Sequence, residues 1–186
     1  SLCKRPHNVC RPPERVATGP NQVWAWDITY LKRDVQGLYF YMYSIIDVWS
    51  RKIVDWEIAT SESAEVAERL FKRLARFFDG HEPLYLHSDN GNAMKAETLL
   101  ITLYRLGVVP SRSRPRVSDD NAFIESFFKT LKYAPNYPGH FATLEKAYQW
   151  MDAFITWYNT KHVHSGIGYV TPEQKHAGQA DAIIAH

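Results

Sequence analysis

Three acidic residues occupy positions where a purely structural role is hard to explain. Asp27 lies in the middle of a predicted strand, between Trp26 and Ile28, although Asp is disfavoured in strands. A carboxylate inside a sheet is costly unless a cation lies beside it, and a metal ion is the usual partner. Asp89 follows the end of a later predicted strand, where open α/β sheets place ligands, and Glu125 lies on the exposed stripe of a predicted helix. Metal binding is therefore one interpretation of these acids.

Each of the three acids also has an ordinary structural interpretation. Asp89-Asn90-Gly91 is a common turn tripeptide, and Glu125 between lysines suits a solvent-exposed helix face with weak ion pairs. Thirty-five residues separate Asp89 from Glu125, but such a spacing between Asp and Glu also arises by chance. The context is more specific, because the first acid lies in the first strand, the second follows a later strand, and the third lies on a helix beyond a basic segment.

This basic segment directly precedes the helix that contains Glu125. Its alternating arginines are Arg112, Arg114 and Arg116. Clustered Arg and Lys residues bind phosphate, but a run of charge is often only solvated surface. We favour phosphate contact because the segment is expected to border the acids. On the helix itself, Lys129 and Lys132 follow Glu125 at i+4 and i+7 and share its exposed stripe.

Two polar residues lie close to Asp89 in the sequence. His87 shares its strand face two residues earlier, and Asn90 follows it directly. His87 is either a strand-end histidine with local hydrogen bonds or a residue that supports an acidic ligand through a hydrogen bond. Asn90 is a candidate for the same supporting role. Two further acids, Asp47 and Asp55, are interpreted as structural.

The acids are spread over strands and helices that alternate along the chain. Strands are predicted over residues 23–31, 38–47, 51–60, 84–88 and 108–109. Helices are predicted over residues 62–78, 93–106, 119–132 and 144–161, and Thr171-Pro172-Glu173-Gln174 is a capping box that begins another short helix. This order of elements predicts one α/β domain with a mixed sheet and helices on its faces.

Three details of this prediction concern local structure. Ser61 is expected to cap the helix over residues 62–78. In the strand over residues 51–60, Glu57 is expected on a solvent-exposed face, as in an edge strand. Residues 111–117 are expected to form the Arg-rich loop.

The composition is that of a globular domain. The chain has 186 residues, of which 45% are hydrophobic and 23% are charged, which excludes a disordered or collagen-like chain. The longest nearly apolar stretch, residues 38–46, is far shorter than the roughly 20 residues of a membrane span, and we expect no membrane association and no signal peptide. The net charge of +2 argues against nucleic-acid binding, but residues 1–20 and 105–132 are both basic, so the average conceals two basic segments.

The chain divides into three predicted parts. Residues 1–20 contain several prolines and arginines and are expected to form an arm or a linker remnant. Residues 21–178 are expected to form the core and residues 179–186 a C-terminal tail. Cys3 and Cys10 lie in the arm without four nearby zinc ligands, so we expect free thiols in a reducing compartment. No Met opens the chain, and we expect it to be a fragment of a longer protein.

Four segments contain most of the residues discussed above. They are Gln22-Val23-Trp24-Ala25-Trp26-Asp27-Ile28-Thr29, His87-Ser88-Asp89-Asn90-Gly91, the segment from Asp120 to Lys132, and Tyr158-Asn159 followed by His164-Ser165-Gly166-Ile167-Gly168-Tyr169 and Thr171-Pro172. In these motifs, from about residue 20 to 175, the chain resembles the integrase-type catalytic core of bacterial insertion-sequence transposases, which are related to retroviral integrases. The resemblance implies a ribonuclease-H-like fold with a five-stranded mixed sheet.

The resemblance also implies roles for individual residues. It implies that Asp27, Asp89 and Glu125 are the catalytic Asp-Asp-Glu triad and hold two Mg²⁺ or Mn²⁺ ions, which prefer oxygen ligands. Two such ions about 4 Å apart stabilise the attacking and leaving oxygens of a phosphoryl displacement. It further implies that Lys132 contacts DNA, and Lys129 on the same stripe joins it in the predicted DNA-binding set.

The function implied by the resemblance is DNA transposition. The core would cut DNA at a transposon end and join the freed 3′-hydroxyl to target DNA, as a homo-oligomer in the bacterial cytoplasm, associated with the nucleoid. The family's helical DNA-binding region normally precedes the core, and we expect it to be missing from this chain. Two alternatives stay open: a hydrolytic nuclease of the same fold that does not join DNA, and a domesticated, non-catalytic DNA-binding module. The intact acids argue against the second.

Overall fold

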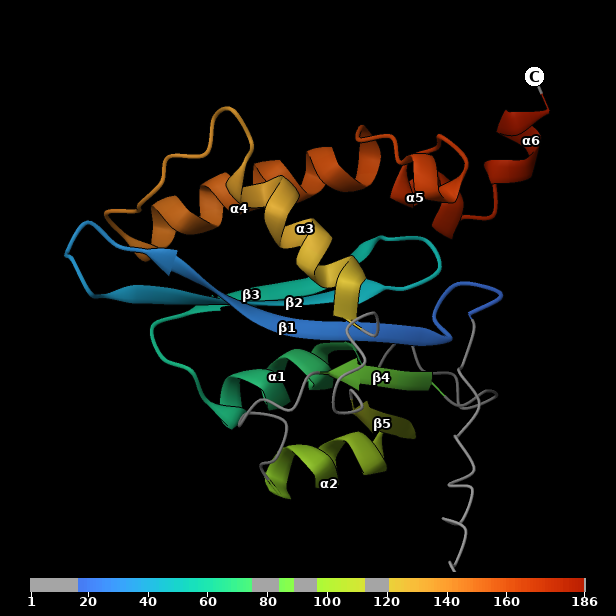
Figure 1. Cartoon of the computed structure of the whole chain (residues 1–186). Coiled ribbons are helices and arrows are strands. Elements are labelled where there is room, and N and C mark those ends of the chain that lie inside the picture. The colour runs from blue at the N-terminus through green and yellow to red at the C-terminus, as the bar shows by residue number, and fades with distance from the viewer. Residues whose placement is uncertain (1–16, 75–83, 89–96, 113–120, 186) are drawn as a thin grey trace, which may run out of the picture.

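The computed structural model describes residues 17–74, 84–88, 97–112 and 121–185. Its strands are β1 (Val23–Lys32), β2 (Tyr39–Asp47), β3 (Ile53–Ala59), β4 (Leu84–Ser88) and β5 (Val108–Arg112). They form one sheet in the order β3-β2-β1-β4-β5, in which β1 pairs antiparallel with β2, β2 antiparallel with β3, and β4 parallel with both β1 and β5 (Figure 1). The predicted five-stranded mixed sheet is thus confirmed.

Helices cover both faces of this sheet. They are α1 (Ala64–Leu74), α2 (Glu97–Arg105), α3 (Ala122–Lys132), α4 (Leu144–Thr160), α5 (Pro172–His176) and α6 (Ala180–Ile184). In Figure 1, α1 and α2 lie on one face and α3 and α4 on the other, and α5 and α6 follow at the C-terminal end. Within the described residues, no helix combines the length and the apolar character needed to cross a bilayer.

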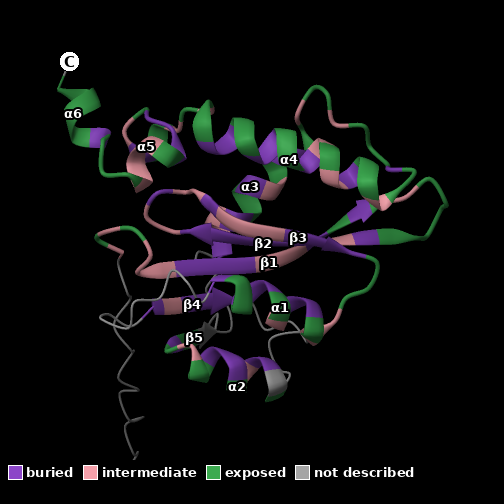
Figure 2. Ribbon diagram, turned by 180° about the vertical axis from the view of Figure 1, so that it is seen from behind, coloured by how far each residue is buried: buried purple, intermediate pink, exposed green. Residues whose placement is uncertain are grey.

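Two hydrophobic cores, one on each face, follow from the alternation of side chains along the strands. Trp24 and Trp26 of β1 are buried together with residues of α1 and α2, whereas Ala25 and Leu31 are buried with residues of α3 and α4. Figure 2 shows buried residues along the strands and on the helix sides that face them. Burial on both faces explains why β1 and β2 are largely apolar throughout their length.

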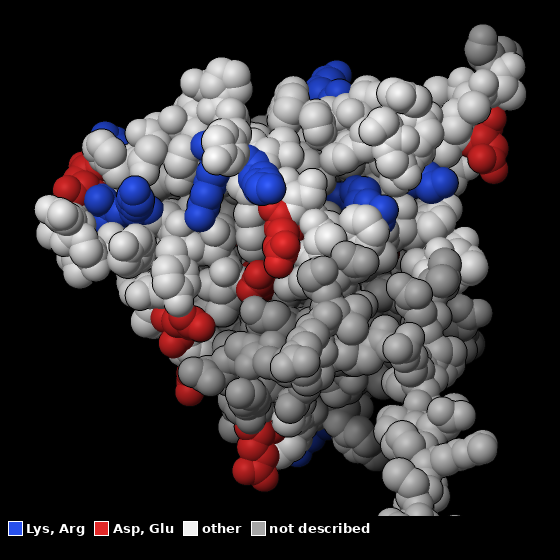
Figure 3. Space-filling model, in the orientation of Figure 1, with Lys and Arg blue, Asp and Glu red and all other residues white. Residues whose placement is uncertain are grey.

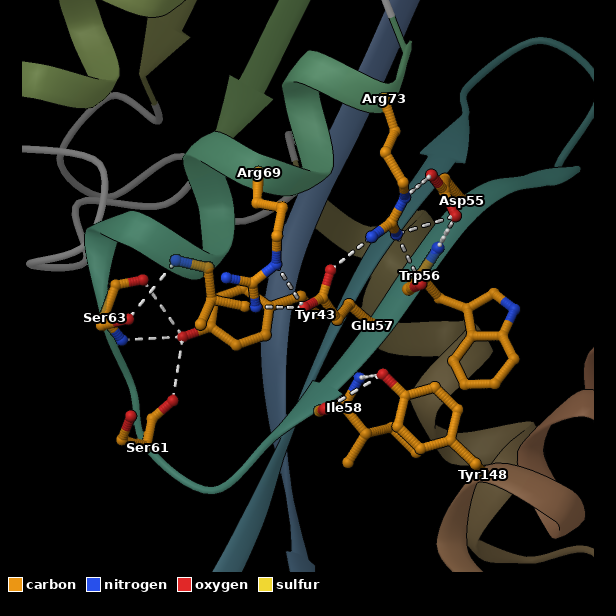
Figure 4. A network of polar contacts seen from close by, with 11 residues as sticks. Tyr43, Asp55, Trp56, Glu57, Ile58, Ser61, Ser63, Arg69, Arg73 and Tyr148 are labelled. Atoms are coloured by element: carbon orange, nitrogen blue, oxygen red, sulfur yellow. Dashed lines mark hydrogen bonds and ion pairs between the residues drawn. The ribbon is translucent and has the colours of Figure 1, made fainter. Parts of the chain in front are cut away.

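One acidic residue that was predicted at the surface is buried. Glu57 of β3 is only 7% exposed and lies beneath α1, where its carboxylate accepts hydrogen bonds from Arg69 and Arg73 (Figure 4). The Nε of Arg73 also lies 3.2 Å from a carboxylate oxygen of Asp55. The prediction for Glu57 was wrong because α1 covers this face of the edge strand. A carboxylate there requires cations that offset its lost hydration.

The first helix begins later than predicted. It starts at Ala64, and the N–H of Val66 donates to Ser63 Oγ at 3.4 Å, so Ser63 rather than Ser61 caps it. The Tyr43 hydroxyl accepts a hydrogen bond from the N–H of Ser63 at 2.8 Å and lies 3.3 Å from the carbonyl oxygens of Ser61 and Ser63 (Figure 4). The Tyr43 side chain therefore binds the backbone of the residues before α1, and the helix begins only after them.

Two side chains of α4 cover the outer edge of β3. Asn159 accepts a hydrogen bond from the N–H of Ile53 at 2.9 Å and donates one to its carbonyl oxygen at 3.0 Å. The Tyr148 hydroxyl makes the corresponding two bonds with the N–H and the carbonyl oxygen of Ile58, both at 3.1 Å (Figure 4). An edge strand otherwise exposes such groups to pairing with other chains. The same bonds fix α4 along the sheet.

The opposite edge strand is longer than predicted. β5 runs from Val108 to Arg112 and does not end at residue 109, so the first two residues of the predicted loop over 111–117 belong to a strand. Pro110 suggests an early end because proline cannot donate to a sheet ladder. It is tolerated here because β5 lies at the edge of the sheet.

The C-terminal part contains one expected and one unexpected helix. The capping box before α5 is confirmed, since the N–H of Gln174 donates to Thr171 Oγ1 at 3.2 Å and the N–H of Thr171 donates to Gln174 Oε1 at 3.0 Å. Residues 179–186, predicted as a tail, contain α6, whose Ala180 is buried with Val170. This segment therefore packs on the rest of the C-terminal part.

Candidate active site

β1 places Asp27 on the face of the sheet that α3 covers. Ala25 and Leu31 share its face by alternation and are buried with residues of α3 and α4. Asp27 is half-buried, lies opposite Ser44 of β2, and accepts a hydrogen bond at Oδ1 from the N–H of Ile28 at 2.8 Å. The strand therefore holds this carboxylate on the α3 side of the sheet.

α3 brings Glu125 to the same side. The buried residues of α3 are Ile124, Phe127 and Leu131. They pack in the core that contains Ala25, so α3 lies against β1 and β2. Glu125 is exposed in the first turn, where the positive end of the helix dipole favours an acid. Figure 3 shows acidic side chains where α3 meets β1, with basic side chains on both sides. Two of the three predicted acids, Asp27 and Glu125, thus share one side of the sheet.

The third predicted acid, Asp89, lies outside the described residues, and only the register of β4 bears on its position. The predicted site residues outside the described part of the chain are Asp89, Asn90, Arg114 and Arg116. β4 pairs in parallel with β1, with His87 opposite Ala25. In the sequence, Asp27 and Asp89 each follow this pair by two positions. The strand register is therefore consistent with a site that the two acids share, which stays a prediction.

Two further predicted residues lie near the described end of β4. His87 is 8% exposed and lies opposite Ala25 of β1 and Ser111 of β5. Arg112, of which only the backbone is described, lies opposite Ser88, the last described residue of β4. The supporting role of His87 and the phosphate contact of Arg112 stay predictions.

Three exposed lysines are here called the lysine group: Lys32 at the end of β1, and Lys129 and Lys132 on α3. Partial burial, and then the positive charge of Lys32, lower the pKa of Lys132. No carboxylate of the described residues forms an ion pair with any of the three. Neighbouring cations repel each other, and a phosphate would relieve that repulsion. The sequence analysis did not include Lys32 in the predicted DNA-binding set, although this residue ends the strand that contains Asp27.

Two other acids have structural partners, as expected. Asp47 is fully buried and accepts hydrogen bonds from the N–H of Asn21 at 2.8 Å, the N–H of Ser50 at 2.8 Å and the Ser50 hydroxyl at 2.7 Å. His176 Nδ1 of α5 lies 2.8 Å from the same hydroxyl. Asp55 is paired with α1 as described above. These contacts fix the turn between β2 and β3.

Asp27 and Glu125 provide the donor atoms that a hard divalent cation prefers, namely carboxylate oxygens. Among the residues that the structure describes, no three His, Cys, Asp or Glu side chains form a metal-binding group. The third predicted ligand, Asp89, does not belong to those residues. The two described acids therefore fit part of the ligand set.

Comparison of the sequence with known proteins identifies relatives. Two family profiles, both described as integrase core domain, match residues 17–118 and 106–172. The transposase for insertion sequence element IS904 of Lactococcus lactis is 36% identical over 158 residues, which are 84% of this chain and 62% of that protein. Transposase InsF for insertion sequence IS3A of Escherichia coli is 32% identical over 159 residues, 85% of this chain and 54% of that protein. The chain thus spans about half to three-fifths of the length of these curated relatives.

Solved structures share the fold. The HTLV-2 integrase catalytic core domain in complex with magnesium matches with a TM-score of 0.65 at 16% identity, covering 87% of this chain and 99% of that chain. The catalytic core domain of BIV integrase matches with a TM-score of 0.64 at 19% identity, covering 88% and 98%. Their ribonuclease-H-like fold confirms the predicted fold class. Since the first family profile alone covers more than half of the sequence, the chain belongs to the integrase core domain family.

Proposed function

We propose that this chain is the catalytic core of a bacterial insertion-sequence transposase, which cleaves DNA and joins it to a target in a reaction that requires Mg²⁺ or Mn²⁺. The observation that supports this function is the placement of Asp27 and Glu125 on one side of the sheet, together with the lysine group. The transposases among the relatives support it independently.

In this proposal, Asp27, Asp89 and Glu125 hold two divalent ions. Such ions, when bound, stabilise the attacking and leaving oxygens of a phosphoryl displacement. Asp27 presents its carboxylate from a strand, and Glu125 presents its carboxylate from the helix layer above it. His87 and Asn90 would orient the Asp89 carboxylate through hydrogen bonds, because outer partners of this kind fix the position of ligands.

DNA would lie along α3. The lysine group would bind phosphates of the DNA backbone, with an affinity that falls as salt concentration rises. The arginines at and after the end of β5 would add phosphate contacts; these are Arg112, Arg114 and Arg116. The same surface would receive the transposon end and the target DNA in turn.

We further propose that the active form is a homo-oligomer in the bacterial cytoplasm, associated with the nucleoid. The HTLV-2 integrase core is known in dimeric and trimeric forms, which supports an oligomer. Residues 21–178 would constitute the core, and residues 1–20 would connect it to a DNA-binding region.

The test is a joining reaction that does not depend on recognition of a transposon end. A labelled oligonucleotide with a free 3′-hydroxyl is incubated with the chain, plasmid DNA and Mg²⁺ or Mn²⁺. We expect joined products that disappear when the metal is chelated. Asp27→Asn and Glu125→Gln should each lower the yield by a factor of roughly 100 or more, because each removes a metal ligand.

The matched control is Asp152→Asn, which removes an exposed acid of α4 and should leave the yield unchanged. Cleavage without joining would support the hydrolytic nuclease. DNA binding that needs no metal, without any cleavage, would support the non-catalytic module. Both outcomes contradict the proposed function.

A further inference from the structure

We propose that Arg51 binds a DNA phosphate at the N-terminal end of α3. Glu125 separates this position from the lysines at the C-terminal end of the helix. The inference rests on the proposed function. Arg51 lies in the turn between β2 and β3. The sequence gives no hint of this role, because 74 positions separate Arg51 from Glu125.

The turn holds Arg51 in an unusual backbone conformation. Its φ is 65°, in the left-handed region that is uncommon for residues other than glycine. Its N–H donates to the carbonyl oxygen of Asp47 at 2.8 Å, and the buried Asp47 carboxylate is bound to Ser50. Strained residues of this kind cluster at functional sites when the surrounding structure fixes them. Here the surrounding hydrogen bonds provide that fixation.

The side chain of Arg51 is directed to the first turn of α3. Its guanidinium carbon lies 3.4 Å from the centre of the Phe123 ring, a stacking contact between a cation and an aromatic face. Phe123 is the second residue of α3, two positions before Glu125. A stacked guanidinium keeps its planar edge of N–H donors available for an oxygen-bearing ligand.

The charge of Arg51 lacks a carboxylate partner within the described residues. No ion pair and no side-chain hydrogen bond of Arg51 is present among them. Burial lowers the pKa of Arg51 and the charge of Asp47 acts against that shift, but the Asp47 carboxylate is hydrogen-bonded to Asn21 and Ser50. A cation beside a helix N-terminus is also electrostatically unfavourable, because that end has a partial positive charge. An anion between the two would be favourable to both.

The other groups around Arg51 do not supply that anion. His164 lies close enough to Arg51 and His162 for their charges to act on it. Burial, and then these two charges, lower the pKa of His164 to about 4. It is therefore neutral at pH 7. At the N-cap of α3, Asn121 is 6% exposed, and its side-chain oxygen has no hydrogen-bond partner among the described residues. This oxygen only accepts hydrogen bonds, as a phosphate does, so a water molecule that donates to both would satisfy it.

A DNA strand is the ligand that matches this arrangement. If the acids hold the reacting phosphate, the strand continues in both directions from it. Lys129 and Lys132 lie on the C-terminal side of Glu125 along α3, and Arg51 lies on its N-terminal side. Figure 3 shows basic side chains on both sides of the acidic ones. Cations on both sides would bind phosphates before and after the reacting one.

The experiment measures binding of a short duplex by fluorescence anisotropy between 50 and 200 mM salt. Arg51→Gln should weaken binding roughly three- to tenfold at 100 mM salt and lower the slope of log K against log salt by about 0.9, the loss of one phosphate contact. The control is Lys52→Gln, which changes the same charge at the next residue. Lys52 is paired with Glu173 at 2.9 Å, so this variant should keep the wild-type slope.

Arg51 could instead neutralise Asp119 or Asp120, which precede α3 in the sequence. In that case Arg51→Gln would lower the melting temperature, Asp119→Asn with Asp120→Asn would restore it, and the salt slope would stay at the wild-type value. An unchanged slope overturns the proposal for Arg51 alone. Absence of DNA binding by the wild-type chain would contradict the proposed function as well. If Arg51→Gln does not fold, Arg51→Lys is measured, and wild-type affinity in that variant overturns the proposal, because lysine cannot reproduce the stacked fork.

Discussion

At the scale of single residues, surroundings decide what each acid can do. Glu57 and Asp27 both lie on strands, but Glu57 accepts hydrogen bonds from Arg69 and Arg73 beneath α1. Its negative charge is thereby compensated inside the protein. Asp27 and Glu125 lie instead on the side of the sheet that α3 covers, and α3 also bears Lys129 and Lys132. An acid thus serves structure at Glu57, whereas we propose that Asp27 and Glu125 hold metal.

The stability of the protein should depend on pH through His164. Burial, and then His162 and Arg51, lower its pKa to about 4, whereas an unfolded histidine titrates near 6.5. The folded state therefore disfavours the protonated form, so this stability is complete above about pH 6.5 and is lost as the pH falls toward 4. His164→Phe keeps the edge-on ring contact with Tyr158 but cannot titrate.

Urea unfolding at pH 7 and pH 5 measures this effect. The wild-type chain should lose about 1 kcal/mol more unfolding free energy over this range than His164→Phe, after allowance for solvent screening of a half-buried group. Equal losses in the two proteins would show that His164 is not the responsible group.

The sequence identified a candidate residue where its type was unusual for its predicted secondary structure. Asp27 stood out because an acid is unusual inside a strand. Glu57, Lys32 and Arg51 did not stand out, because what defines them is a partner far away in the chain. Glu57 is buried by α1, Lys32 lies near Lys132, and Arg51 is stacked on Phe123. Contacts of this kind are fixed by tertiary packing and leave no local pattern.

At the scale of elements, α4 does more than cover one face of the sheet. Asn159 and Tyr148 reach the outer edge of β3 and bind the backbone groups that have no partner strand. This arrangement joins helix and strand by polar bonds as well as by apolar packing. It also removes an exposed strand edge, which is a common start of aggregation.

Asn159→Ala should be strongly destabilising. Asn159 is 9% exposed, and its loss leaves the N–H and the carbonyl oxygen of Ile53 without partners in a buried setting. We expect a loss of about 2 to 3 kcal/mol in unfolding free energy, and about 1 kcal/mol for Tyr148→Phe at the half-buried position. Urea unfolding measures both. Tyr133→Phe serves as the control, since Tyr133 is 83% exposed; equal midpoints for all three variants would contradict a role of α4 in sealing the edge.

The elements were largely predictable from periodicity, and their ends were not. Strands and long helices appear where alternation and apolar stripes placed them. α6 was missed because its N-cap, Gln179, makes no side-chain cap hydrogen bond and its sequence lacks a start signal. The start of α1 was misplaced because Tyr43, a residue of another element, binds the segment before it. Boundaries that depend on tertiary contacts are not encoded locally.

At the scale of the whole molecule, the sheet separates two surfaces with different charge. The acids of the candidate site lie on the α3 side, and α3 itself bears Lys129 and Lys132. On the opposite face, the basic residues of α1 are paired with acids: Lys72 with Glu68, and both arginines with β3. The net charge of +2 averages over these two surfaces. DNA should therefore bind to only one face.

Two lysine substitutions test this asymmetry. Lys32→Gln and Lys132→Gln should each lower the slope of log K against log salt by about 0.9, and the double variant by about 1.8, because each removes one phosphate contact. Neither change should lower the melting temperature, because the two charges repel each other in the free protein. Lys72→Gln on the opposite face is the matched control. Equal slopes for all variants would place the DNA elsewhere.

The contact between Ser50 and His176 joins residues that are 126 positions apart. During synthesis, a chain that has reached α4 already contains every strand, every candidate metal ligand and the turn that bears Arg51. That turn still lacks its last partner until His176 has left the ribosome. Since domains complete long-range contacts late in folding, we expect nascent chains to build the sheet first and to fix Arg51 last. The turn that presents Arg51 would then be fixed only after α5 has been synthesised.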